Sequence, residues 1–299
     1  MATQKLIKLD PWFTTGFTDG EGCFAIIIYR DKRLSTGWRV QLSFQIALHQ
    51  KDKVLLEQVR NYFGVGSITK RGEEMIQFRV SSEKDLKVIL DHFEKYPLIT
   101  KKRADYELFK KALNCINEKE HLSTEGLYKI VALKASMNRG LSDELKAAFP
   151  NTFPVVRPLV QILPIPNPQW VAGFTSGEGC FMCMIYKSNT KAGEAVQLTF
   201  QLTQNIRDEQ LMRSLIEYFD CGKIYRRSDA VDLRVRQFSD INDKIIPFFV
   251  KYPILGVKYK DFEDFCKVAD IMKKKGHLTE EGLGLIRQIK TGINKGRFT

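Results

Sequence analysis

Apolar and polar residues alternate along several stretches of the first half of the chain, most regularly over residues 39–47 and 76–81. A period of two residues predicts β-strands with one buried face and one polar face. Residues 23–31 indicate a further strand. The order helix, two strands, helix, two strands and further helices predicts an antiparallel sheet covered by helices on one face. Segments with helical spacing lie at 52–62, 83–95, 103–118 and 124–138.

The second half of the chain repeats the first. Residues 16–24 read GFTDGEGCF and residues 173–181 read GFTSGEGCF, identical at eight of nine positions and 157 residues apart. The correspondence continues at an offset of 156, so that residues 95–97 and 251–253 both read Lys-Tyr-Pro. A nearly constant offset predicts two copies of one fold. We therefore expect an α+β protein of two αββαββα repeats, each with a four-stranded antiparallel sheet, related by a pseudo-two-fold axis.

A proline-rich stretch separates the two copies. Residues 150–168 hold six of the ten prolines. Because proline fixes φ and removes a hydrogen-bond donor, this stretch is expected to be an extended connector. The predicted domain organisation is a first repeat at residues 1–149, the connector at 150–168 and a second repeat at 169–299.

The charge balance narrows the range of partners. The chain has 47 Lys+Arg against 35 Asp+Glu, a formal net charge of +12, which favours polyanions such as nucleic acid. No apolar run of about 18 residues predicts a membrane span, and the first residues lack the character of a secretory signal. The six scattered cysteines indicate free thiols in a reducing intracellular compartment. The four histidines lack metal or nucleophile spacing and are expected to be structural.

The polar face of the predicted sheets has a composition suited to DNA. It carries Gln, Arg, Ser and Thr with one Asp and no Glu, and these side chains match the donors and acceptors of base edges in the major groove. The candidates for base contacts are Arg39, Gln41, Ser43, Gln45, Gln77, Arg79, Tyr186, Gln197, Thr199, Gln201, Thr203, Asp232, Arg234 and Arg236. The candidates for phosphate contacts, at expected strand ends and turns, are Arg30, Lys32, Arg33, Lys70, Arg71, Lys187, Lys191, Arg226 and Arg227. Two such sheets side by side would form a saddle on double-stranded DNA.

Each copy has an apolar-rich helical segment that ends in Gly-Glu-Gly, at residues 12–22 and 169–179. Glycines four residues apart allow two helix backbones to approach closely. Packing of the two helices would bring Glu21 and Glu178 to the same end, near the pseudo-two-fold axis. Gly22 and Gly179 are expected in the left-handed conformation that terminates many helices.

Two carboxylates at the negative poles of two helix dipoles require cations. Ligands that are all oxygen select a hard ion that keeps several waters, Mg²⁺ before Zn²⁺. Such ions activate water and stabilise the leaving oxygen of a scissile phosphate. The motif therefore predicts a Mg²⁺-dependent DNA endonuclease, a phosphodiester hydrolase.

Residues 14–22 and 171–179 resemble the signature of the LAGLIDADG homing endonucleases, with Glu at the acidic eighth position in both copies. The chain is similar to the two-motif, single-chain branch encoded in fungal mitochondrial introns. The resemblance implies a monomeric enzyme with an internal pseudo-dimer, a mitochondrial location and a double-strand cut that leaves short 3′ overhangs in a long asymmetric site. It implies Mg²⁺, replaceable by Ca²⁺ or Mn²⁺, held by Glu21 and Glu178 and by the main-chain carbonyls of Gly20 and Gly177.

The resemblance also implies a basic residue near each scissile phosphate, five positions after the proline of Lys-Tyr-Pro. Lys102 and Lys258 fit this spacing. A polar strand residue of the solvent network matches Gln204, whereas the first copy has Leu48 at the equivalent place. The two half-sites are therefore expected to differ chemically, with the strands cut in sequence.

Three other functions were weighed against a nuclease. An RNA-binding intron maturase on the same fold would take intron RNA as its partner. A DNA-binding regulator would have lost catalysis, and the two retained glutamates argue against it. A basic protein with a merely structural duplication is disfavoured by the composition of the polar sheet faces. The maturase stays open as the alternative, because RNA could bind a surface other than the sheets.

Overall fold

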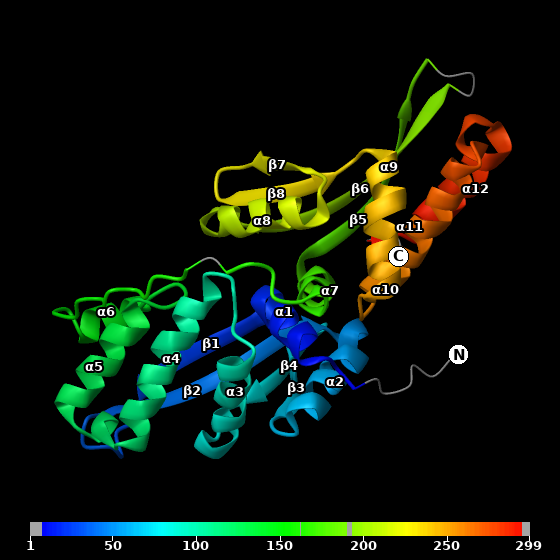
Figure 1. Ribbon diagram of the computed structural model, residues 1–299. Helices are drawn as coiled ribbons and strands as arrows, with labels where there is room; N and C mark the ends of the chain where they lie inside the picture. Colours follow the sequence, from blue (N-terminus) through cyan, green and yellow to red (C-terminus); the bar gives the residue numbers. More distant parts are fainter. Residues whose placement is uncertain (1–7, 162, 190–192, 295–299) are drawn as a thin grey trace. The chain divides into compact units, whose positions relative to one another are not determined.

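The computed structural model describes residues 8–161, 163–189 and 193–294, and the chain divides into two compact units, Met1–Leu163 and Pro164–Thr299. Each unit is a repeat that combines a sheet with helices in the same order (Figure 1). Within each sheet every neighbouring pair of strands is antiparallel. The predicted α+β class and the four-stranded sheet of each repeat are confirmed.

Unit 1 has a sheet with the strand order β1-β2-β4-β3. Its elements are α1 (Pro11–Glu21), β1 (Gly22–Arg30), β2 (Trp38–His49), η1 (Gln50–Asp52), α2 (Lys53–Phe63), β3 (Ser67–Arg71), β4 (Met75–Val80), α3 (Glu83–Lys95), α4 (Lys102–Asn117), η2 (Glu120–Leu122), α5 (Thr124–Ala135) and α6 (Asp143–Ala148).

Unit 2 repeats this arrangement with the strand order β5-β6-β8-β7. Its elements are α7 (Pro168–Glu178), β5 (Gly179–Lys187), β6 (Glu194–Asn205), η3 (Ile206–Asp208), α8 (Glu209–Phe219), β7 (Lys223–Arg226), β8 (Ala230–Val235), α9 (Phe238–Asp240), η4 (Ile241–Ile245), α10 (Ile246–Lys251), α11 (Lys258–Lys273), η5 (Gly276–Leu278) and α12 (Glu280–Thr291).

The first helix of each unit begins at a capped proline. The Asp10 carboxylate accepts a hydrogen bond from the amide of Trp12 at 2.8 Å, and Pro11 occupies the first position of α1. In unit 2 the side chain of Asn167 accepts from the amide of Gln169 at 2.8 Å, ahead of Pro168. Both caps satisfy amides that have no partner inside the helix. The two motif helices therefore begin in the same way, with an Asp or Asn cap followed by proline.

Aromatic rings hold the helices to one face of each sheet. In unit 1 the buried Phe24 lies 5.1 Å from Phe44 and 5.4 Å from Phe109 of α4, measured between ring centroids. In unit 2 Phe181 lies 5.3 Å from both Phe200 and Phe265 of α11. Because side chains alternate along a strand, the residues between these phenylalanines point to the opposite face, where the polar positions lie.

The predicted connector lies along unit 1 for part of its length. Residues 152–161 have neither helix nor strand. The Arg157 guanidinium donates to both carboxylate oxygens of Asp105, at 2.8 and 2.9 Å, and to the carbonyl of Ser136 at 2.7 Å. Along the chain, unit 1 ends at Leu163, and α7 of unit 2 begins at Pro168. In the part of the chain that the structure describes, no helix has the length and apolar character needed to cross a membrane.

Two helices differ from the expected ranges. The helix expected over 124–138 ends at Ala135, and Asn138 adopts a positive φ of 47° while its side chain donates to the carbonyl of Phe24 at 2.8 Å. The counterpart of α3 in unit 2 contains a π-helical turn, η4, just before Pro247. Proline has no amide hydrogen to donate, so regular α-helical pairing is interrupted there.

Unit 1 holds a polar trio formed by Thr15 of α1, Tyr62 of α2 and His92 of α3, of which Thr15 and His92 are buried and Tyr62 is half-buried. The Thr15 hydroxyl donates to the Tyr96 carbonyl at 2.9 Å, so it accepts from Nε2 of His92 at 3.0 Å. The Tyr62 hydroxyl then donates to Nδ1 of His92 at 3.0 Å. These bonds require a neutral imidazole, and burial lowers the pKa of His92 to about 4.

The His92 trio makes unit 1 sensitive to acid. Because the pKa of His92 is lower in the folded state than in the unfolded state, stability is lost as pH falls from about 6.5 towards 4. Between pH 7 and 5 we expect a loss of about 2 kcal/mol in the free energy of unfolding. The variant Thr15→Ala/His92→Phe copies the residues of unit 2 and should lose this dependence. Urea unfolding of both proteins at the two pH values measures it, and equal losses would contradict the assignment.

Candidate acidic centre and nucleic-acid interface

The two predicted acids occupy the same position in each unit. Glu21 is the last residue of α1 and Glu178 is the last residue of α7, and both are half-buried. The helices end on carbonyl groups that lack helical partners and carry the negative pole of the helix dipole. Each unit thus places a carboxylate where the local potential already attracts cations.

The two predicted lysines lie on these helix ends. Lys102, at the start of α4, donates through Nζ to the carbonyl oxygens of Thr18 at 2.8 Å and Gly20 at 2.9 Å. Lys258, at the start of α11, donates to the carbonyls of Thr175 at 3.3 Å and Gly177 at 2.5 Å. The sequence placed a lysine near each centre, and the structure shows it binding the carbonyl directly before the acid.

The two glycines after the acids do not adopt the expected conformation. Gly22 and Gly179 are extended, with φ of −74° and −76°, so the left-handed prediction is wrong. Glycine is required here by a close approach. A Cβ at Gly22 would lie 2.8 Å from the Thr18 carbonyl oxygen, and one at Gly179 would lie 2.6 Å from that of Thr175. The chain passes directly from helix to strand in a space that has no room for a side chain.

Gln204 was expected in the solvent network near the scissile phosphates. It lies near the end of β6 and shares the helix-covered face with Leu202. Its side-chain oxygen accepts from the amide of Asn205 at 2.9 Å. Leu48 occupies the equivalent position of β2 and is buried. The chemical difference between the repeats is therefore present, and a role for Gln204 stays a prediction.

On the polar face of unit 1 the base-contact candidates form one network. Gln77 donates to the side-chain oxygen of Gln45, and Gln45 donates to the hydroxyl of Ser43 at 3.0 Å. Arg79 also donates to Ser43, at 3.1 Å. Ser43 is fully buried, so it orients its neighbours and cannot itself contact DNA in this conformation. This corrects its expected role.

The polar face of unit 2 is organised around a buried acid. Asp232 has no exposed surface and accepts from Arg227 at 2.8 Å, Arg234 at 2.7 Å and the Thr203 hydroxyl at 2.8 Å. It was expected to contact bases, and so was Thr199, which is also buried. Both expectations need correction, because both side chains are buried, and that of Asp232 is enclosed by Thr203, Arg227 and Arg234. Asp232 instead fixes two arginines, which remain partly exposed.

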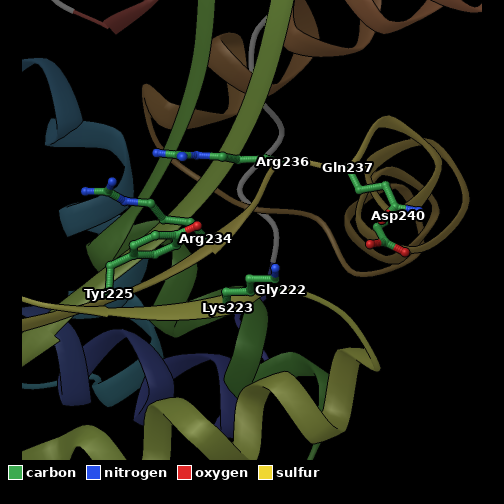
Figure 2. A pocket seen from close by; sticks show the side chains of 7 residues that line it. All are labelled: Gly222, Lys223, Tyr225, Arg234, Arg236, Gln237 and Asp240. Carbon is green, nitrogen blue, oxygen red and sulfur yellow. The ribbon is translucent and has the colours of Figure 1, made fainter.

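Tyr225, Arg234 and Arg236 line a pocket in unit 2 (Figure 2). The guanidinium carbons of Arg234 and Arg236 lie 5.0 and 5.2 Å from the centroid of the Tyr225 ring, within the range of cation–π attraction. Lys223 lines the same pocket, and Asp240 of α9 contributes an acid to it. Ring and guanidinium planes of this kind are suited to contacts with nucleotides.

Four basic candidates share the helix-covered side of their sheets. Arg226 forms an ion pair of 2.7 Å with Glu209 of α8, and Arg30 forms one of 3.5 Å with Glu144 of α6. The strand registers place Lys70 and Lys187 on the same side as core residues. These four side chains therefore do not lie on the polar faces. The reason is parity, since adjacent strand residues point to opposite faces.

In the turn between β1 and β2, Asp31 binds two of the predicted arginines. Arg33 and Arg39 each donate to its carboxylate at 2.8 Å, and these bonds hold the pKa of Asp31 well below its usual range. Lys32 is exposed in the same turn, whereas Lys191 falls outside the described residues. Asp31 thus links Arg33 of the turn to Arg39 of β2.

The remaining candidates lie on the polar faces, and Arg71, which was expected at a strand end, is the last residue of β3. They are Gln41, Arg71, Tyr186, Gln197 and Gln201. Sequence reasoning missed other residues of these faces, namely Tyr29, Ser67, Thr69, Met75, Lys223 and Tyr225. Four of them, Ser67, Thr69, Lys223 and Tyr225, lie on the edge strands β3 and β7, which are short and alternate weakly, so only pairing with β4 and β8 reveals these positions.

We expect Asp232→Asn to weaken binding of unit 2 to DNA. Loss of the charge releases Arg227 and Arg234 from a fixed geometry, and a charge-assisted hydrogen bond contributes about 1.5–3 kcal/mol, so affinity should fall about tenfold or more. Asp229→Asn makes the same charge change in an exposed turn and is the matched control. Fluorescence anisotropy with labelled DNA measures both. Equal affinities for the two variants would remove Asp232 from the interface.

The fold and the repeated acid together define the class of protein: a single chain of two α+β repeats, each with a glutamate at the end of its first helix. The chain belongs to the LAGLIDADG endonuclease family, whose sequence model matches residues 14–113 and 171–269. The resemblance stated from the two nine-residue motifs is thereby confirmed.

Related proteins agree with this assignment. The chain is 43% identical over 285 residues to "Probable intron-encoded endonuclease 3" and 40% identical over 300 residues to "Probable intron-encoded endonuclease 2", both of Neurospora crassa. These matches cover 94% and 95% of this chain but only 54% and 65% of the relatives. The chain thus spans between half and two thirds of their length.

A solved structure resembles the chain over nearly all of its length. I-SmaMI bound to an uncleaved DNA target in the presence of calcium ions is 48% identical, with a TM-score of 0.94. The match covers 96% of this chain and 100% of that one. The meganuclease I-CpaMI bound to uncleaved DNA is also 48% identical, with a TM-score of 0.93.

Proposed function

We propose that this protein is a site-specific homing endonuclease that makes a double-strand break in a long asymmetric DNA target. The break would result from divalent-metal-dependent phosphodiester hydrolysis and leave short 3′ overhangs. The observation that carries the proposal is the repeated helix end, where Glu21 and Glu178 each follow a carbonyl that already binds an ammonium group. The DNA-bound state of the similar I-SmaMI supports it.

The donors at each helix end fit a hard divalent ion. Every candidate ligand is an oxygen, from Glu21 and Glu178 or from the carbonyls of Gly20 and Gly177, and these carbonyls attract cations in this structure. Within the described residues, no three His, Cys, Asp or Glu side chains gather into a metal cluster. A site with so few protein ligands suits Mg²⁺, which keeps several waters and is completed by phosphate oxygens. Ca²⁺ or Mn²⁺ would occupy the same oxygens.

The chain's own residues have separate roles in this proposal. Glu21 and Glu178 hold the ions, which when bound supply an activated water and stabilise the leaving oxygen. Lys102 and Lys258 place a positive charge beside the scissile phosphates, where negative charge increases in the transition state. Gln204 would orient water in one half-site only. Because the repeats differ at this position, the two strands are expected to be cut at different rates.

The polar sheet faces would select the target. Arginine is suited to guanine and glutamine to adenine, and the two faces present different sets of both. The Gln45–Gln77 pair of unit 1 and the Arg227–Arg234 pair of unit 2 therefore read different half-sites, which fits an asymmetric target. Lys32, Arg33 and Arg71 are placed to hold phosphates, whose contacts position the protein without reading sequence.

One cleavage experiment tests the proposal directly. The protein is incubated with a randomised DNA library in Mg²⁺ or in EDTA, and the cleaved products are sequenced. The expected result is a single enriched site of asymmetric sequence, cut only in Mg²⁺ and with 3′ overhangs. Intact DNA under both conditions, together with tight binding of intron RNA, would overturn the nuclease and favour the maturase.

The proposal extends to organisation and location. We expect a monomer in which residues 1–149 and 169–299 act as an internal pseudo-dimer joined by the connector at 150–168. A mitochondrial location is expected from the resemblance to fungal intron-encoded enzymes, and the curated relatives are named as intron-encoded. Sedimentation with and without target DNA tests the monomer, which should bind one DNA molecule per chain.

A further inference from the structure

In unit 1 a buried carboxylate accepts hydrogen bonds from the segment directly before Lys102. Asp19 of α1 is 1% exposed and accepts from the amides of Ile99 at 3.1 Å and Thr100 at 3.2 Å. It also accepts from the Thr100 hydroxyl at 2.5 Å. Three donors thus converge on one carboxylate, and all come from residues just ahead of α4.

The hydrogen bonds extend to Lys102 itself. The Thr100 hydroxyl oxygen accepts from the amide of Lys102 at 3.2 Å, so Thr100 connects Asp19 to the backbone of the lysine. The connector residue Arg157 donates to the carbonyl of Lys101 at 3.2 Å. Both polar groups of the peptide bond between Lys101 and Lys102 are thus hydrogen-bonded at the start of α4. From there the Nζ of Lys102 donates to the carbonyl of Gly20.

Unit 2 makes a different set of bonds at the same place. Ser176 replaces Asp19, and its hydroxyl accepts from the amide of Leu255 at 3.0 Å while donating to the carbonyl of Ala172 at 2.8 Å. Gly256 replaces Thr100. As a glycine it offers no hydroxyl group to the amide of Lys258, and its φ of 78° is positive. The differences between the repeats at Asp19/Ser176 and at Thr100/Gly256 both bear on how the lysine is held.

We propose that Asp19, acting through Thr100, is a positioning residue for Lys102, and that it makes the lysine of unit 1 more firmly held than Lys258. The inference rests on the proposed function for its catalytic consequence, because each lysine would serve one scissile phosphate. Misplacement of a catalytic group by about 1 Å can cost about 10²-fold in rate. Loss of Asp19 should therefore slow one strand selectively.

The first test measures the lysines without DNA or metal. Brief reductive methylation followed by peptide mass spectrometry gives the labelling rates of Lys102 and Lys258 in one sample. Asp19→Asn should raise the rate of Lys102 relative to Lys258 by about three- to tenfold, the equivalent of one or two lost hydrogen bonds. Thr100→Val, which removes only the hydroxyl, should change the ratio in the same direction. An unchanged ratio in both variants overturns the proposal whether or not the protein cuts DNA.

The second test uses a target labelled separately on each strand. Lys102→Ala identifies the strand served by unit 1, and Asp19→Asn should slow that strand by about 10–100-fold while the other changes little. Because general destabilisation slows both strands together, the strand ratio separates positioning from folding. Asp91→Asn, an exposed acid on α3, is the charge-matched control. Equal slowing of both strands by Asp19→Asn rejects the positioning role, whereas a native protein that cuts neither strand rejects the nuclease instead.

Discussion

Substitution of either motif glutamate by glutamine is expected to abolish double-strand cleavage while leaving DNA binding intact or stronger. Glu21→Gln and Glu178→Gln each remove one metal-binding carboxylate at the end of a motif helix. The amide keeps the size of the side chain but cannot bind a hard cation as a carboxylate does. Loss of this charge stabilisation should slow cleavage by about 10²–10³-fold or more. Removal of a negative charge beside the DNA backbone should preserve or improve affinity.

Cleavage and binding are measured on the same target. A gel assay in Mg²⁺ separates supercoiled, nicked and linear plasmid, and anisotropy with labelled DNA gives the affinity. Glu217→Gln, at an exposed position of α8, makes the same chemical change away from the helix ends. It should cut at the native rate. Full activity of Glu178→Gln would remove this residue from the mechanism, and reduced cutting by the control would point to a general effect of charge.

Affinity for DNA should fall steeply with salt. The chain carries a formal net charge of +12, and the polar faces include Arg39, Arg71, Arg79, Lys223 and Arg234. Each phosphate neutralised by a basic residue releases condensed counterions, and dilution of these ions drives binding. If six or more phosphates are held, affinity should fall by about 10³-fold between 50 and 200 mM salt. The cleavage-deficient Glu178→Gln variant allows this measurement in Mg²⁺.

The slope of log affinity against log salt also tests which face binds. Lys223→Ala, on the polar side of β7, should reduce the slope by about one unit if Lys223 contacts a phosphate. Arg226→Ala is the matched control, because Arg226 is the next basic residue of β7 and pairs with Glu209 on the helix side. A flat salt response of the native protein would contradict phosphate-dominated docking. Equal changes in both variants would contradict the assignment of faces.

Much of the fold followed from local patterns. Alternation over 39–47 predicted β2, because a strand with one buried face must repeat every two residues. The two copies of the Gly-Glu-Gly motif predicted equivalent acids, and the structure puts both at the last residue of a helix. The resemblance to the family, applied through the spacing from Lys-Tyr-Pro, pointed to Lys102 and Lys258. These features depend on residues that are close in sequence or related by the repeat.

Other features escaped sequence reasoning because they depend on pairing across the chain. Arg226 and Arg227 are adjacent and looked alike, yet the register with β8 turns Arg226 towards α8, while Arg227 binds Asp232. Asp232 was grouped with the base-contact candidates because alternation predicts the face on which a side chain lies but not how exposed it is. Its burial follows from the arginines and the threonine packed around it.

The sequence by itself determined the duplication, the class of fold and the pair of acids. The class of fold follows from the alternation of apolar and polar residues, and the duplication and the acids follow from the repeated motif. Only the tertiary structure decided which carbonyls Lys102 binds. It alone showed that Asp19 and Ser176 hold the lysine segments differently. These contacts join residues about 80 positions apart, such as Asp19 and Thr100. No local pattern encodes them, since they arise only when helix α1 and the start of α4 pack together.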